Sequence, residues 1–226
     1  MNNLENFVWG PMEPEMKEIL TKEFFDNEEC IYEKFNKVKE GDVVLDIGSS
    51  CGPFSYKIKD RNISKLYCVE PSVSQIKALT KNIDDLKHYE IINKAIGSDN
   101  QSTEAFVYGD KNVFKTVESI KFNTLIKEYG IKKIDFLKTD CEGGEYDIFN
   151  IENLCWLKEN MKYCVGEWHF HSPEDKQKFR EFRDVFMRVF SKHEVYSCNG
   201  VDIKWDLWNE HFIDYYTGVI IYIDNR

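Results

Sequence analysis

The sequence has no hydrophobic run that could cross a membrane. None of its 226 residues belongs to a stretch that approaches the ~20 consecutive apolar residues of a spanning helix. The segment Met1–Asn6 also lacks the basic start and apolar core of a secretory signal. We therefore expect a cytoplasmic protein without a membrane span.

Paired cysteine motifs are absent as well. The seven cysteines include no C-x-x-C pair, and their number is odd. Neither a zinc knuckle nor a disulfide framework is indicated. Reduced cysteines that fill apolar positions are the better interpretation, and they agree with a cytoplasmic location.

The chain also lacks a basic stripe. Its formal net charge is −10, and its lysines are scattered among acidic residues. Since a nucleic-acid-binding protein should concentrate basic residues on one face, we expect no nucleic-acid partner. A negative field suits a cationic cofactor and a neutral or polar acceptor.

Linkers, repeats and low-complexity segments are missing too. With 42% hydrophobic residues, a chain of this length is ample for one core. We predict that residues 1–226 form one domain. A helical N-terminal extension, 1–40, precedes an α/β core, 41–226.

The core is organised around one stretch, Gly41–Phe54. Its apolar, β-branched run Val43–Ile47 predicts a buried strand. A turn containing Gly48 and Gly52 follows, and then a helix that begins at proline. Strand, glycine turn and helix form the first unit of a doubly wound (Rossmann-like) fold, in which ligands bind at the carboxyl ends of the strands.

The residues around this turn favour a particular ligand. The dinucleotide fingerprint needs a middle glycine, but Ser50 stands there, which disfavours a nicotinamide cofactor. Asp46 would repel a pyrophosphate and attract the ammonium of an amino acid. Glu70 closes the next apolar run, where a ribose-binding carboxylate belongs. Ala95, after a third strand, would lie beside the adenine. A ligand with amino-acid and nucleoside ends is S-adenosylmethionine.

The remaining periodicity predicts further alternation of strands and helices. We expect strands at 65–69, 89–93, 134–138, 163–168, 194–198 and 217–224, helices at 72–82, 123–129 and from 172, and a hairpin of 103–108 with 115–120 around the loop 109–112. A helix opened by Glu145 should turn Ile148, Phe149 and Leu154 inward.

Acidic residues cluster after the strand at 134–138. Asp140 and Glu142 follow it on a turn, next to the first strand of a doubly wound sheet. Glu145 comes at a helix N-terminus, where a carboxylate meets the favourable end of the helix dipole. Helix capping and function are both open for Glu145.

A third group of polar residues lies at the end of the strand predicted at 163–168 and directly after it. Glu167, His169 and His171 alternate with aromatic residues, so a period of two places them on one face. Three such residues at the carboxyl end of a strand indicate a ligand crevice rather than a core.

Four segments together resemble the FkbM family of S-adenosylmethionine-dependent methyltransferases. They are Asp42–Ser55, Val69–Pro71, Phe136–Tyr146 and Glu167–His169, and the most specific is the Lys-x-Asp-x-Glu-Gly-x-Glu pattern that begins at Lys138. The sequence departs from the family at Ser50, where asparagine is common, and at Asn123, where aspartate is common. The first departure weakens detailed expectations about contacts of the glycine turn.

The resemblance implies a fold, a reaction and a set of site residues. The fold is a seven-stranded, mostly parallel sheet of the class I methyltransferase type, with its last strand antiparallel. The reaction is O-methylation of a hydroxyl on a sugar, a glycan or a small natural product. The cofactor residues would be Asp46, Gly48, Ser49, Ser50, Gly52, Glu70, Pro71, Ala95 and Asp140. The residues on the acceptor side would be Asp140, Glu142, Glu145, Glu167, His169 and His171.

An alcohol acceptor must lose its proton during methyl transfer. His169 is our first choice for the general base and Asp140 the second, with Glu167 orienting the base or sharing the proton. In a rival mechanism, magnesium or manganese is held by Asp140, Glu142, Glu167 and His169. We favour the metal-free mechanism, because no compact ligand motif specifies a metal.

Two other functions fit parts of the pattern. A non-catalytic S-adenosylmethionine-binding regulatory module would keep Asp46 and Glu70 but would not need the polar face at Glu167–His171. A nicotinamide-dependent oxidoreductase is disfavoured by Asp46 and by the missing glycine.

Overall fold

The computed structural model describes residues 4–26, 31–107, 113–198, 200–204 and 206–226. The predicted hairpin loop at 109–112 and Cys30 therefore lie outside the described residues. Within the described ranges, no helix combines the length and the apolar content that crossing a membrane requires.

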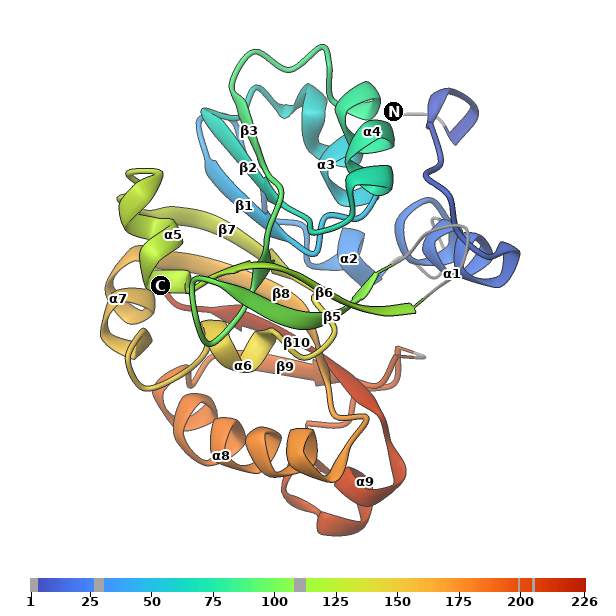
Figure 1. Cartoon of the computed structure of the whole chain (residues 1–226). Coiled ribbons are helices and arrows are strands. Elements are labelled where there is room, and N and C mark those ends of the chain that lie inside the picture. Colours follow the sequence, from blue (N-terminus) through green and yellow to red (C-terminus); the bar gives the residue numbers. More distant parts are fainter. Residues whose placement is uncertain (1–3, 27–30, 108–112, 199, 205) are drawn as a thin grey trace.

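A seven-stranded sheet forms the centre of the protein (Figure 1). Its order is β3-β2-β1-β7-β8-β10-β9. The strands are β1 (Val43–Ile47), β2 (Lys65–Val69), β3 (Tyr89–Ile92), β7 (Ile134–Thr139), β8 (Met161–His169), β9 (His193–Tyr196) and β10 (Gly218–Asp224). Neighbours from β3 to β8 run parallel, whereas β10 is antiparallel to both β8 and β9. This topology confirms the predicted mostly parallel sheet with an antiparallel last strand.

Both faces of the sheet are covered by helices, which explains why its central strands are mostly apolar. One apolar layer joins the sheet to α1 (Pro14–Phe24), α2 (Ile31–Lys34), α3 (Pro53–Ile58) and α4 (Val73–Asn82). The other joins it to α5 (Phe122–Glu128), α6 (Glu145–Ile148), α7 (Leu154–Asn160), α8 (Pro173–Val189) and α9 (Glu210–Tyr215). Successive residues of one strand serve different layers: Val44 belongs to the first and Leu45 to the second.

The N-terminal extension is fastened to α4 by two buried amides. Asn82 Nδ2 donates to the carbonyl of Val8, and the amide N–H of Val8 donates back to Asn82 Oδ1, both at 2.8 Å. Gln75 Nε2 donates to the carbonyl of Pro11 at 2.6 Å. These bonds hold α1 near the carboxyl edge of the sheet.

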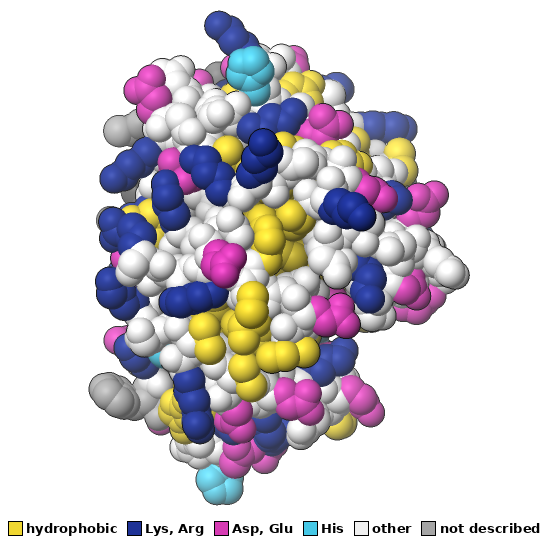
Figure 2. Space-filling model, turned by 90° about the vertical axis from the view of Figure 1, so that its left-hand side faces the viewer, with side chains coloured by type: hydrophobic (Ala, Val, Ile, Leu, Met, Phe, Trp, Pro, Cys, Tyr) yellow, Lys and Arg dark blue, Asp and Glu magenta, His cyan; other side chains and the backbone are white. Residues whose placement is uncertain are grey.

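A smaller sheet lies over the same edge. The hairpin β5 (Ser102–Val107) and β6 (Val113–Ile120) is antiparallel, and β6 also pairs with the short β4 (Ala95–Ile96). Figure 1 shows this hairpin crossing in front of the central sheet, between α6 and the helices of the N-terminal half. The side of the protein with α5 and α7 carries basic and acidic side chains around a central group of hydrophobic ones (Figure 2).

The segment after Glu145 differs from the expectation. Two short helices, α6 and α7, replace one helix that would have carried Leu154 inward, and Leu154 is only partly buried. The buried side chain of Asn153 donates to the carbonyls of Asp147 and Ile148 at 3.1 and 3.0 Å. Because Asn153 satisfies these C-terminal carbonyls, α6 ends after one turn.

Candidate active site

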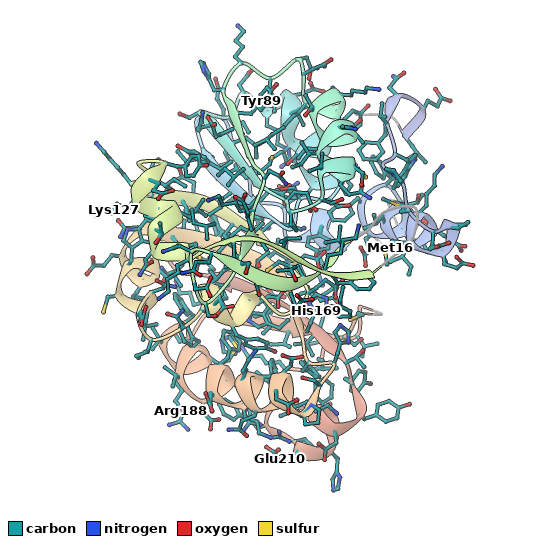
Figure 3. The ribbon with its side chains drawn as sticks, in the orientation of Figure 1. Met16, Tyr89, Lys127, His169, Arg188 and Glu210 are labelled. Carbon is teal, nitrogen blue, oxygen red and sulfur yellow. The ribbon has the colours of Figure 1, made fainter. Side chains whose placement is uncertain are left out.

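A cavity of about 560 Å³ opens at the carboxyl edge of the central sheet. The ends of β1, β2, β7 and β8 form its floor, while α1 and the hairpin β5–β6 form its walls. Figure 3 shows Met16 of α1 and His169 of β8, both of which line this cavity. Parallel strands bring their carboxyl ends to one edge, so residues far apart in the sequence meet here.

The glycine turn after β1 packs closely against the segment after β7. Gly48 has a φ of +72°, and a Cβ built there would lie 1.7 Å from the carbonyl oxygen of Asp140. Ser50 also adopts a positive φ, +50°, and its buried Oγ has no hydrogen-bond partner among the described residues. Since Ser50 lines the cavity, this hydroxyl is available to a ligand.

Glu70 directly follows β2 and lines the same end of the cavity. Its carboxylate accepts backbone N–H bonds from Ser50 and Ser72, both at 2.8 Å. Burial raises the pKa of Glu70 to about 7, against the effect of these hydrogen bonds. Pro71 and Ala95 line the cavity beside it. Glu70 therefore lies where a ribose-binding carboxylate was predicted.

Asp46 lies beneath the turn rather than in the cavity. It is fully buried, with Lys138 Nζ 3.6 Å from its Oδ1 and Ser55 Oγ donating to its Oδ2 at 2.6 Å. Burial raises the pKa of Asp46, and Lys138 and Ser55 oppose the rise. Ser49 and Gly52 are likewise absent from the cavity lining. Direct contact of Asp46 with a ligand ammonium, as expected from the sequence, does not follow from this placement.

Glu145 is also placed differently from the expectation. Its side chain is completely buried, where it accepts backbone N–H bonds from Cys141 at 2.7 Å and from Gly143 at 2.8 Å. The remaining contact joins Oε1 to Nδ1 of His169 at 3.2 Å. Glu145 therefore contacts Nδ1 of His169 from within the core. It does not line the acceptor side of the cavity.

His169 is the centre of the polar end of the cavity. Its Nε2 lies 3.8 Å from Asp140 Oδ1, 3.7 Å from Glu142 Oε2 and 3.8 Å from Glu167 Oε1. His171, which is half exposed, places its Nε2 3.4 Å from Glu142 Oε2. The structure thus brings together the polar residues that the sequence placed after two separate strands. We call these five residues the His169 cluster.

The carboxylates set the electrostatics of the cluster. Burial would lower the pKa of His169, but Glu145, Glu167 and Glu142 raise it well above its ordinary value. Burial raises the pKa of Glu167, and the charge of His169 acts to lower it. A raised pKa means that the imidazole holds its proton more tightly than a free histidine does. The role of simple general base stays a prediction that these surroundings do not favour.

Sequence reasoning missed four contributors to the site. Lys138, opposite Asp46 in the β1–β7 register, also lies 3.7 Å from Asp140 Oδ2; its position at the end of a buried strand was the available signal. Glu23 reaches the cavity from α1, and burial, Asp140 and Glu167 raise its pKa to about 8. Cys198 Sγ donates to Glu167 Oε1 at 3.1 Å. Phe114 lines the rim from the hairpin. No sequence spacing signals these last three contacts.

Comparisons with known proteins agree with this fold. A model of the methyltransferase FkbM domain matches residues 26–198. An rRNA methylase from Streptococcus thermophilus covers 87% of this chain and 95% of its own, with 9% identity and a TM-score of 0.53. A putative rRNA methylase from Clostridium thermocellum covers 85% and 92%, with 13% identity and a TM-score of 0.50. A search of curated protein sequences found no match. At these identities, the solved structures show a shared fold alone.

Proposed function

The chain belongs to the FkbM family of S-adenosylmethionine-dependent methyltransferases, and from this premise we propose that it methylates a hydroxyl group of an uncharged, polyhydroxylated acceptor. A sugar, a glycan or a small natural product has this chemistry. The observation that carries the proposal is one cavity lined by the carboxylate Glu70 at one end and by the carboxylate–imidazole cluster of His169 at the other.

The first end fits the methyl donor. Glu70 would receive the ribose hydroxyls, with Ser50 Oγ beside it and Ala95 near the adenine. Gly48 leaves the backbone bare where the turn passes Asp140, so the ligand can approach the main chain closely. When bound, S-adenosylmethionine supplies a methyl group whose C–S bond breaks as the acceptor oxygen forms the new O–C bond, and the electron pair stays on sulfur.

The second end fits a hydroxyl acceptor. Asp140 adjoins the glycine turn, because its N–H donates to the carbonyl of Ile47 at 3.1 Å. Asp140 is therefore the residue of the His169 cluster that adjoins the methyl-donor end. Carboxylate oxygens of Asp140, Glu142 and Glu167 can accept hydrogen bonds from several hydroxyls of one acceptor. Positioning of this kind supplies much of the rate in an in-line displacement.

The charge of the cavity favours a neutral acceptor over nucleic acid. Asp140, Glu142 and Glu167 line the polar end. Lys94 and Lys178 also line the cavity, but each ammonium neighbours a carboxylate, Glu118 at 4.0 Å and Asp175 at 3.5 Å. Since carboxylates repel phosphates, the acidic side chains of the cavity would oppose the binding of RNA. The RNA substrate class of the rRNA methylases above therefore does not transfer to this chain.

The proposal is tested by release of S-adenosylhomocysteine with a panel of acceptors. The panel contains free sugars, nucleotide-sugars, glycans, hydroxylated natural products and, as a separate arm, structured RNA. We expect turnover with at least one uncharged hydroxyl acceptor and none with RNA. Turnover with RNA alone would overturn the acceptor class. Tight S-adenosylmethionine binding without turnover on any acceptor would favour the non-catalytic module.

A further inference from the structure

The ligand atoms of the His169 cluster are spaced as if around a common centre. The three carboxylate oxygens nearest His169 Nε2 are at 3.7–3.8 Å. These separations are too long for hydrogen bonds. The donor atoms of Asp140, Glu167 and His169 lie within 4.8 Å of one another, as do those of Glu142, His169 and His171. Ligands that each lie about 2.1 Å from one cation are about 3–4 Å apart, so small shifts would complete a coordination sphere.

The support of His169 gives a second, independent indication. Glu145 is an ionised carboxylate held by two backbone N–H groups, so the ring N–H on Nδ1 must be the donor in its contact with His169. Nε2 is left facing the cavity, and it makes no hydrogen bond to any residue that the structure describes. The His169 side chain is nevertheless buried, with 7% of its surface exposed. A buried histidine with one nitrogen fixed by a carboxylate and the other directed at further carboxylates is typical of a metal ligand.

The hydroxyl of Tyr32, in α2, is a further polar group that the described part of the fold leaves unpaired. It is buried and has no hydrogen-bond partner among the described residues. Burial raises the pKa of Tyr32, and the charges of Asp140 and Glu167 raise it further.

We propose that Asp140, Glu167 and His169 bind one divalent cation, with Glu142 and His171 at its open side. Mixed carboxylate and imidazole ligands suit manganese, which accepts oxygen and nitrogen donors. If the proposed O-methylation is correct, the acceptor hydroxyl binds the cation at this open side. The cation would lower the pKa of that hydroxyl, whose proton passes to water before the oxygen attacks. Glu145 is then a positioning residue that acts through His169.

The direct test measures Mn²⁺ binding and needs no acceptor. Chelator-treated protein is titrated with Mn²⁺, and the loss of the free-ion signal is followed by electron paramagnetic resonance. We expect one ion per chain. Glu167→Gln and Asp140→Asn each remove a ligand charge with little change in shape and should weaken Mn²⁺ binding by about tenfold or more. Glu104→Gln, which removes a carboxylate of the same cavity outside the cluster, should bind Mn²⁺ as the wild type does.

Two further measurements distinguish a loss of folding from a loss of the cation site, and the cation site from the methylation. Each variant must unfold in urea as cooperatively as the wild type, which shows that it is folded. Absence of Mn²⁺ binding in the wild type, or unchanged binding in both cluster variants, would overturn the site. Full turnover by chelator-treated protein would overturn the role of the cation and leave O-methylation standing. Conversely, stoichiometric Mn²⁺ binding without methylation of any hydroxyl would support the site and overturn the proposed function.

Discussion

Gly48 lies against the main-chain carbonyl of Asp140, so closely that a Cβ at position 48 would be 1.7 Å from that oxygen. This contact joins the glycine turn after β1 to the acidic segment after β7. It fixes the methyl-donor end of the cavity next to the His169 cluster. A side chain at this position would push the two segments apart.

Gly48→Ala should therefore impair both stability and cofactor binding. The control is Gly41→Ala, because Gly41 has a similar φ of +79° but no atom within 4 Å of a built Cβ. The control should lose about 1–2 kcal/mol of unfolding free energy, the cost of a left-handed backbone. Gly48→Ala should lose about 1–3 kcal/mol more and bind S-adenosylhomocysteine about tenfold more weakly. Equal results for both variants in urea unfolding and calorimetry would contradict the close packing.

Glu70 should make the stability of the ligand-free protein depend on pH. Its pKa is about 7 in the folded protein and 4.5 in an unperturbed glutamate, so the folded state holds the proton more tightly. The stabilisation is complete below pH 4.5 and is lost as the pH rises through 7. The full stabilisation linked to Glu70 is about 3 kcal/mol. Urea unfolding between pH 5 and 8 should show a smaller decline for Glu70→Gln than for the wild type. Parallel curves would refute this assignment.

The sequence allowed the strands of this site to be predicted, but not its contacts. Val43–Ile47 and Lys65–Val69 are strands at the predicted bounds, because each is a short apolar run that ends at a charged residue or a glycine. The polar face of Glu167, His169 and His171 was also recognisable, since a period of two fixes which side chains share a face. These predictions depend on local patterns alone.

Contacts between distant segments could not be read from local patterns. Glu145 precedes a helix and looked like a capping residue or an acceptor ligand, yet it is buried against His169. Asp46 was expected to attract a ligand ammonium, yet Lys138 of the neighbouring strand pairs with it. Glu23 enters the cavity from the N-terminal extension, whose path is set by the amides of α4. Each case depends on how two elements pack, which spacing does not encode.

Glu145→Gln tests whether the carboxylate behind His169 is needed for catalysis. A glutamine keeps the shape but removes the charge that orients the imidazole, so kcat should fall by about 10–100-fold. Affinity for S-adenosylhomocysteine should stay within a few-fold, because Glu145 does not line the cavity. Glu152→Gln, an exposed carboxylate in the loop after α6, is the control and should leave kcat unchanged. A wild-type kcat in folded Glu145→Gln would remove its positioning role.

Gln75→Ala tests whether the N-terminal extension shapes the acceptor side. Loss of the hydrogen bond to Pro11 should loosen the segment that carries α1 and cost about 1–3 kcal/mol. The KM for the acceptor should rise several-fold, and limited proteolysis should cut before Glu23 more rapidly. Lys77→Ala, on the exposed side of the same helix, should change neither. An unchanged KM together with unchanged proteolysis would show that α1 is held by other contacts.

The most direct measurement uses S-adenosylmethionine carrying ¹³C in its methyl group. The protein is incubated with an acceptor that supports turnover, and the product is examined by nuclear magnetic resonance and mass spectrometry. We predict that the label appears on an oxygen of an uncharged, polyhydroxylated molecule, with one S-adenosylhomocysteine formed per methyl group. Label on a nitrogen or carbon atom, or on a nucleic acid, would contradict the account.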